Sequence, residues 1–457
     1  MRFKSVPGTF QLFAVTGTHT IAFAVDCNDD AMTDLLGFTV DKEYNKPTGE
    51  HIKVTVMGFK VFQERVENPV PGALYSTYDN PIQSFTWEDF TADPGTKYTY
   101  HFTPLYDKPQ NIRRGPEFKI DVETEPLYKL NDHSVFFNRG VASSQAYTNK
   151  FGNKAPEKIP DGKAFDWLSR GLKEAMIVFI DKAGAGDSLH GCFYEFSNDE
   201  ILNQFRTAAD RGAKLHIIYD AKDNAHLDSK TGKMVESFPK EESERSIKIA
   251  KLDQSANVTL IPRQRNKSYL SHNKFMVIIK ADGTKLLWTG STNLSDGGIF
   301  GQSNVGHYVE NTTVSEQYMK YWNELKDDPD AAGLKTGNEN IQKNITINNI
   351  PDGVTTLFSP RKNLESLQFY ADLLDSAKSC GCITFAFSVH PFFEKALSDN
   401  DDKSALTFIL LEKNDEDISD YVYKNNIVKA VGSDLSKNPV YKWVKETNTV
   451  ISILIRM

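Results

Sequence analysis

One order of predicted helices and strands occurs twice in this sequence, and this repetition constrains the fold more than any other feature. Hydrophobic periodicity and turn residues predict, in helix, strand, helix, strand order, the segments 164–175, 189–196, 198–212 and 214–220. The same order is predicted for 364–378, 382–388, 391–397 and 405–412. Strands that alternate with helices indicate a mostly parallel α/β sheet.

The spacing within the two copies also agrees. Phe196 and Ile218 are 22 positions apart, and so are Phe387 and Ile409, which gives a displacement of 191 residues. One equal interval is modest evidence by itself, because α/β elements resemble one another, but the equal element order strengthens it. We therefore predict an internal duplication. In the first copy, Asn198 or Ser197 is the expected N-cap of the helix and Gly212 is its expected C-cap.

Residues 1–125 have a different pattern. Short segments such as "KYTYHFTPLYD" and "FKIDVETE" alternate with period two, and turn signals such as Asp93-Pro94-Gly95 separate them. This pattern predicts an antiparallel β-sandwich. The segment also resembles fibronectin type III modules, loosely and in fold only. We predict a multidomain chain with a β-sandwich over 1–125, a first α/β domain over 126–335 and a second, incomplete one over 345–457.

Length and charge set further bounds. A chain of 457 residues is too long for one hydrophobic core. Its net charge of −8 predicts no general attraction to nucleic acid, so a polyanion would need a local basic site. The N-terminus lacks the pattern of a signal peptide, and no segment approaches the length of a membrane span. We therefore expect a cytoplasmic location.

The segment "SHNKFMVIIKADGTKLLWTGSTNLS", Ser271 to Ser295, contains the candidate site. Side chains alternate along a strand, so His272 and Lys274 should face one pocket. A hairpin through the turn at 281–283 should return Ser291 and Asn293 toward them. Together these residues provide an imidazole, a cation and two donors, which are the groups needed to hold a phosphodiester and stabilise its transition state without a metal.

A basic cluster precedes the motif. It contains Arg263, Arg265 and Lys267, and no acidic residue lies between Gln254 and Ala281. Such a cluster is usually a solvated face, but here it leads directly into the motif and could attract a phosphorylated substrate. We therefore include Arg263 and Arg265 among the candidate substrate-binding residues.

His-x-Lys followed by a strand and Gly-Ser-x-Asn resembles the signature of the phospholipase D superfamily. The resemblance extends over roughly 127–457 and includes "QFRTAADRGAKLHIIYDA", "QSNVGHYVENTTVSEQYMKYWNEL" and "TTLFSP". It implies a metal-independent phosphodiesterase without a cofactor that works through a phosphohistidine. By position, His272 would be the nucleophile or its acid/base counterpart, Lys274 and Asn293 phosphate ligands, and Ser291 a supporting donor. In this family two such motifs meet at one active site.

The sequence departs from this family in three ways. The usual aspartate, five residues after the lysine, is Ile279, and no acidic residue follows the Gly-Ser-x-Asn near Gln302 and Ser303. The displaced partner of His272 would fall near position 463, beyond Met457. Either a homodimer supplies the second motif or the chain ends before it, and we expect the second.

Two hypotheses of different classes follow. The first is a phosphodiesterase that acts on a phospholipid or a nucleic acid, and the four motif residues favour it. The second is a degenerate or truncated phospholipase D-like protein that binds phosphorylated ligands or partners, and the missing aspartate and second motif favour it. The chain's status as an enzyme stays open between them.

Overall fold

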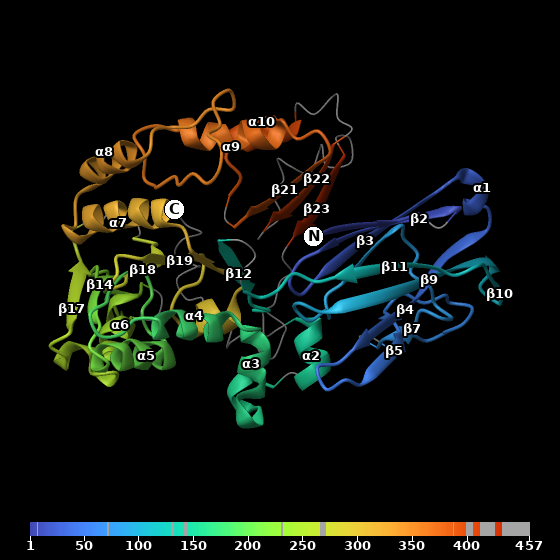
Figure 1. The fold of residues 1–457 in the computed structure, drawn as a ribbon, viewed down its shortest axis with the longest axis horizontal. Helices are drawn as coiled ribbons and strands as arrows, with labels where there is room; N and C mark the ends of the chain where they lie inside the picture. The colour runs from blue at the N-terminus through green and yellow to red at the C-terminus, as the bar shows by residue number, and fades with distance from the viewer. Residues whose placement is uncertain are drawn as a thin grey trace. The chain divides into compact units, whose positions relative to one another are not determined.

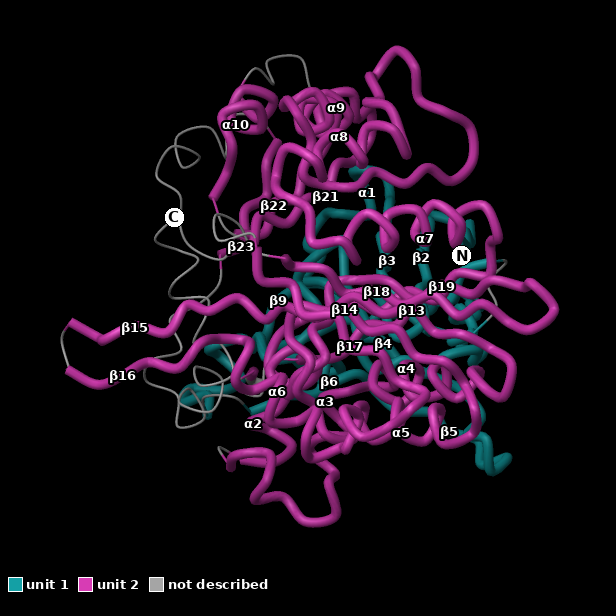
Figure 2. Tube along the Cα trace, turned by 90° about the vertical axis from the view of Figure 1, so that its left-hand side faces the viewer, with its two compact units in different colours: residues 1–134 teal, residues 135–457 magenta. Residues whose placement is uncertain are grey.

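The computed structural model describes the chain except for residues 7, 71–72, 129–131, 141–143, 153, 230–231, 266–270, 387, 399–404, 412–425 and 432–457. Two compact units divide the chain, Met1–Ser134 and Val135–Met457. Figure 2 distinguishes them by colour. The tail expected to precede a second motif lies outside the described residues.

Unit 1 consists of two antiparallel sheets that share one core. The first sheet has the order β1 (Arg2–Ser5), β2 (Phe10–Thr16), β3 (Ile21–Cys27), β8 (Thr86–Asp89). The second has the order β10 (Asn111–Arg114), β9 (Lys97–Lys108), β4 (Leu35–Asn45), β5 (His51–Thr55), with β11 (Phe118–Glu123) also on β9. The minor elements are α1 (Asp29–Met32), β6 (Met57–Gly58) and β7 (Tyr75–Ser76). Buried aromatic residues from both sheets, such as Phe23 and Phe102, form a single cluster.

Unit 2 is built on a seven-stranded mixed sheet. Its order is β12 (His133–Phe137), β20 (Val305–Val309), β19 (Lys285–Gly290), β18 (Lys274–Ile279), β13 (Ser188–Phe193), β14 (Lys214–Asp220), β17 (Val258–Arg263). Strands β13, β14 and β17 are parallel, and β18 is antiparallel to β13. A short ribbon, β15 (His226–Leu227) and β16 (Met234–Val235), follows β14 and projects from the unit in Figure 2.

Helices cover both faces of this sheet (Figure 1). The α-helices between residues 145 and 341 are α2 (Gln145–Phe151), α3 (Lys163–Ser169), α4 (Leu172–Asp181), α5 (Asp199–Asp210), α6 (Lys240–Ile249), α7 (Thr312–Lys326) and α8 (Ala331–Ile341). On one face, Tyr321 and Trp322 of α7 share a buried cluster with strand residues. On the other, Phe205 of α5 packs edge-on against Phe193, with ring centroids 5.8 Å apart.

The predicted elements of the first copy are mostly present. Strand β14 has the predicted bounds, and Asn198 caps α5 by accepting a hydrogen bond from the Ile201 amide at 3.0 Å. The helix predicted over 164–175 is instead two helices, α3 and α4. Arg170 and Gly171 separate them with left-handed φ angles of 51° and 89°, which a continuous α-helix does not allow.

A small parallel sheet follows in the region of the second predicted copy. Its order is β21 (Cys380–Phe385), β22 (Leu406–Leu411), β23 (Ile427–Val431), and α9 (Glu365–Asp375) and α10 (Pro391–Ser398) pack against it. Strands β21 and β22 and helix α10 each begin 192 positions after β13, β14 and α5, one more than the predicted 191. A difference of one position is important in a strand, because successive side chains point to opposite faces of the sheet. Phe387, used for the predicted interval, lies outside the described residues.

None of the helices in the described part of the chain is long and apolar enough to cross a membrane.

Candidate active site

A cavity of about 460 Å³ lies at the end of the seven-stranded sheet where β18 begins. The polar residues in its wall include Arg263, Ser271, His272 and Lys274, and the aromatic ones are Phe275, Tyr318, Tyr321 and Phe358. The cavity therefore combines two cationic side chains and an imidazole with an apolar wall.

The sheet topology explains why these residues meet. Strands β13, β14 and β17 are parallel, so their carboxyl ends lie at one edge, where open α/β sheets usually bind ligands. Strand β18 is antiparallel to β13 and begins at the same edge, with Lys274 directly opposite Phe193. Arg263 is the last residue of β17. The edge thus brings together residues that are far apart in the sequence.

His272 and Lys274 converge on the ring of Tyr194. The imidazole centroid is 4.8 Å from that ring's centroid, and the Lys274 Nζ is 5.4 Å from it. The Lys274 ammonium also donates a hydrogen bond to the backbone carbonyl of His272 at 3.1 Å. Asn273 lies in the cavity wall with Tyr321 and donates a hydrogen bond to the Tyr321 hydroxyl at 2.9 Å. The side chains of His272 and Lys274 therefore lie on the same side of the chain, as strand alternation predicts, although His272 precedes β18.

The His272 imidazole is poised to be neutral. The residue is exposed to solvent, but protein atoms pack around the imidazole ring, and this desolvation lowers its pKa below the ordinary value. The nearby Lys274 cation lowers that pKa further. A neutral imidazole has a free lone pair at neutral pH. Within the described part of the chain, this ring makes no hydrogen bond that would fix its tautomer.

Lys274 is a buried cation. Its residue is 8% exposed, and burial lowers its pKa to about 7, while the negative charge of Glu195 opposes that shift. The charge of Lys274 therefore depends on its surroundings near neutral pH.

Glu195 is a site residue that the sequence analysis missed. It lies just past β13 and is 8% exposed, and its Oε1 accepts a hydrogen bond from Asn293 Nδ2 at 2.7 Å. Its Oε2 accepts one from the Ser295 hydroxyl. Burial raises the pKa of Glu195 to about 7. The signal in the sequence was an acidic residue in the otherwise apolar segment "CFYEF", at the carboxyl end of a predicted parallel strand.

The other predicted site residues take different places. Arg263 is 3% exposed and lines the cavity, whereas Arg265 is exposed and is not part of its wall. The Ser291 hydroxyl donates to Asn304 Oδ1 at 2.8 Å and accepts from the Val305 amide at 3.1 Å. Asn293 lies next to Glu195 rather than in the cavity wall. The structure therefore groups His272, Lys274 and Arg263 in the wall, whereas Asn293 lies outside the wall and is hydrogen-bonded to Glu195.

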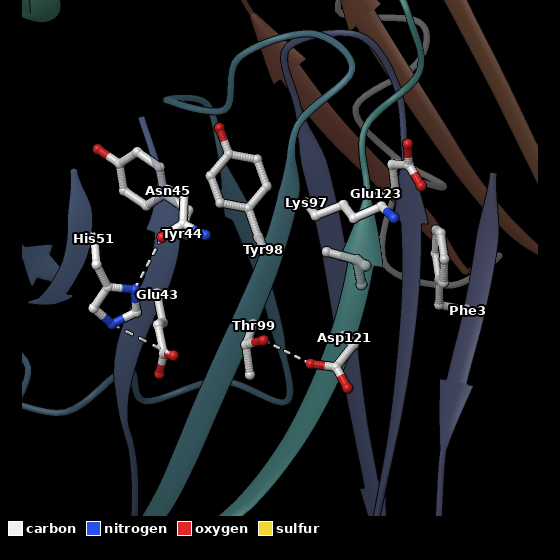
Figure 3. Close-up of a pocket in the computed structure, with 11 residues that line it drawn as sticks. Phe3, Glu43, Tyr44, Asn45, His51, Lys97, Tyr98, Thr99, Asp121 and Glu123 are labelled. Carbon is white, nitrogen blue, oxygen red and sulfur yellow. Dashed lines mark hydrogen bonds and ion pairs between the residues drawn. The ribbon is translucent and has the colours of Figure 1, made fainter. Parts of the chain in front are cut away.

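Unit 1 has a groove of its own, of about 400 Å³ (Figure 3). Several of its polar side chains satisfy one another. Thr99 donates to Asp121 at 2.6 Å, and His51 lies 3.1 Å from Asn45 and 3.6 Å from Glu43. Among the described residues of either unit, no group of three or more His, Cys, Asp or Glu side chains is arranged to hold a metal ion.

Residues 176–326 match the protein family described as cardiolipin synthase, PLD-like domain. The chain therefore contains a domain of the phospholipase D superfamily. The motif from His272 to Asn293 lies inside the matched region, and so does Glu195. None of the curated proteins matches the chain.

Solved structures give partial likenesses to this phospholipase D-like chain. The phospholipase D family member Nuc from Salmonella typhimurium is 19% identical over 34% of this chain and 87% of its own, with a TM-score of 0.25. NucT from Helicobacter pylori is 20% identical over 35% and 91%, with a TM-score of 0.25. Phosphatidylserine synthase from Haemophilus influenzae is 9% identical over 58% and 71%, with a TM-score of 0.36.

Proposed function

We propose that this chain is a phospholipase D-like phosphodiesterase that acts on a phospholipid or nucleic-acid phosphodiester through a phosphohistidine intermediate and without a metal. The observation that supports this function best is the convergence of His272, Lys274 and the buried Arg263 on one cavity. A monoanionic phosphodiester would find two cations there, beside an imidazole that is neutral at pH 7.

The proposed reaction begins with His272. Its ring nitrogen attacks the phosphorus, an N–P bond forms, and the P–O bond to the leaving alkoxide breaks. Lys274 and Arg263 stabilise the charge that grows on the equatorial oxygens, and Asn293 supplies an amide donor. The leaving alkoxide takes a proton, and water then hydrolyses the phosphohistidine. In the family a second histidine gives that proton, and a homodimer would supply one here.

The two sheets of unit 1 support a β-sandwich of the fibronectin type III kind, which we propose as a docking or spacing module over 1–125. Strands β21 and β22 and helix α10 share one displacement from β13, β14 and α5, and this supports an internal duplication with domains over 126–335 and 345–457.

Under the alternative function, a degenerate or truncated site binds phosphorylated ligands or partners. The absence of a hydrogen bond to the His272 ring from any described residue favours this alternative.

A chromogenic diester, bis(p-nitrophenyl) phosphate, tests the function. Hydrolysis is measured in EDTA over a series of protein concentrations for wild type, His272→Ala and His226→Ala, the last of which removes an exposed imidazole from the β15–β16 ribbon. If two copies of the chain complete one site, turnover should rise more than linearly with protein concentration, His272→Ala should abolish it and His226→Ala should retain it. Linear dependence would mean that one chain suffices. No turnover at any concentration would favour the binding function.

A further inference from the structure

Glu195 joins two parts of the site. Its carboxylate oxygens accept from Asn293 Nδ2 at 2.7 Å and from the Ser295 hydroxyl, and its backbone carbonyl accepts from the Leu294 amide at 3.2 Å. These contacts fasten the segment after β19 to the end of β13. Both Glu195 and Asn293 are more than nine-tenths buried. The Asn293 amide, whose Nδ2 donates to Glu195, therefore has its orientation set by that carboxyl group.

The charge of Glu195 is also placed to act on Lys274. In the antiparallel pairing of β13 and β18, Phe193 lies opposite Lys274. Phe193 is the last residue of β13, and Glu195 follows it by two residues. The charged groups that act on Glu195 are Lys274 from β18 and Glu242 from α6. The charged group that acts on Lys274 is Glu195, because burial raises the pKa of the nearby Cys192 thiol to about 12 and keeps it neutral. A buried cation needs such a counter-charge, because removal from water disfavours the charged form.

We propose that Glu195 is a positioning residue of the phosphodiester site: its carboxylate orients Asn293 and Ser295 and supplies the buried negative charge that keeps Lys274 cationic. Glu195 would thus serve in place of the acidic residues that the motif lacks. The inference rests on the proposed function in that it assumes an anion-binding cavity, but it requires no turnover.

The direction of the effect follows from the charges. Burial lowers the pKa of Lys274 to about 7, and the Glu195 carboxylate partly restores it. Replacing that carboxylate by a neutral amide lowers the pKa of Lys274 further, so Lys274 loses its proton at a lower pH. Anion binding that depends on this cation should then fail at a lower pH.

Sulfate titration calorimetry tests this inference, because sulfate keeps its charge across the whole range from about pH 5.5 to about pH 8.5. The variants are Glu195→Gln, which retains an acceptor for Asn293, and Lys274→Met, which locates the binding site. Glu241→Gln is the matched control: it makes the same change at a carboxylate in the first turn of α6 that is not among the charges acting on Glu195 or Lys274. Urea unfolding of each variant reports whether the fold is intact.

We expect Glu195→Gln to bind sulfate as tightly as wild type at about pH 5.5 but about tenfold more weakly at about pH 7.5. Glu241→Gln should follow the wild-type profile, and Lys274→Met should lose binding at every pH. A Glu195→Gln profile that overlays wild type would reduce Glu195 to a structural role and overturn the proposal. So would a wild type that binds no sulfate, whereas a protein that binds sulfate without turnover would contradict only the proposed function.

Discussion

Asp328 connects the turn between α7 and α8 to the end of β17, and so it fixes the residue that brings the second cation to the cavity. Its carboxylate accepts from Arg263 Nε at 3.2 Å and from the backbone amides of Gln264 and Arg265, both at 2.8 Å. The Arg263 side chain is 2% exposed, and within the described residues its Nη2 has no hydrogen-bond partner. Among those residues, this nitrogen is therefore a hydrogen-bond donor that a ligand in the cavity could use. Asp328 is the counter-charge of the Arg263 guanidinium.

Replacing Asp328 should therefore be costly. Asp328→Ala leaves a buried guanidinium unpaired and two backbone donors unsatisfied, so we expect the free energy of unfolding to fall by about 3–5 kcal/mol. Asp327→Ala is the matched control, because Asp327 is the exposed neighbour and should change this free energy by less than about 0.5 kcal/mol. Urea denaturation of the three proteins measures both values. Equal stability of the two variants would mean that Arg263 finds another partner.

At the scale of elements, the sequence predicted what local patterns encode. The bounds of β14, the Asn198 cap and the β18–β19 hairpin follow from residues close together in the chain. Glu195 was missed because its hydrogen-bond partners lie 98 and 100 positions away, and no local pattern reports such a contact. The break at Arg170 and Gly171 was missed because apolar periodicity continued across it.

The glycine of the Gly-Ser-x-Asn motif gives an element-scale prediction. Gly290 ends β19 with φ at 144°, and a Cβ there would lie 2.2 Å from the Val305 carbonyl oxygen. Gly283, in the turn of the same hairpin, has φ at 87° but open space around it. We expect Gly283→Ala to cost about 1 kcal/mol from backbone strain alone, and Gly290→Ala to cost at least about 2 kcal/mol more because backbone must shift. Similar urea midpoints for both variants would contradict this steric role.

At the scale of the whole molecule, the described residues form separate cores. The aromatic cluster of unit 1 draws on residues between Phe3 and Val122, and two clusters of unit 2 draw on residues between Cys192 and Ile427. Unit 1 also has its own buried ion pair, in which Lys42 Nζ lies 2.7 Å from Asp89 Oδ2. The Tyr100 hydroxyl donates to the same oxygen at 2.6 Å. Each unit therefore has the interactions that cooperative unfolding requires.

Two separable unfolding transitions should result. Asp89→Asn leaves the Lys42 cation buried without its counter-charge, so we expect the transition of unit 1 to be destabilised by about 3–5 kcal/mol and that of unit 2 to be unchanged. Asp328→Ala should do the reverse. Differential scanning calorimetry of the full chain shows whether each substitution moves one transition alone. A single transition that both substitutions shift would mean that the two units unfold as one cooperative body.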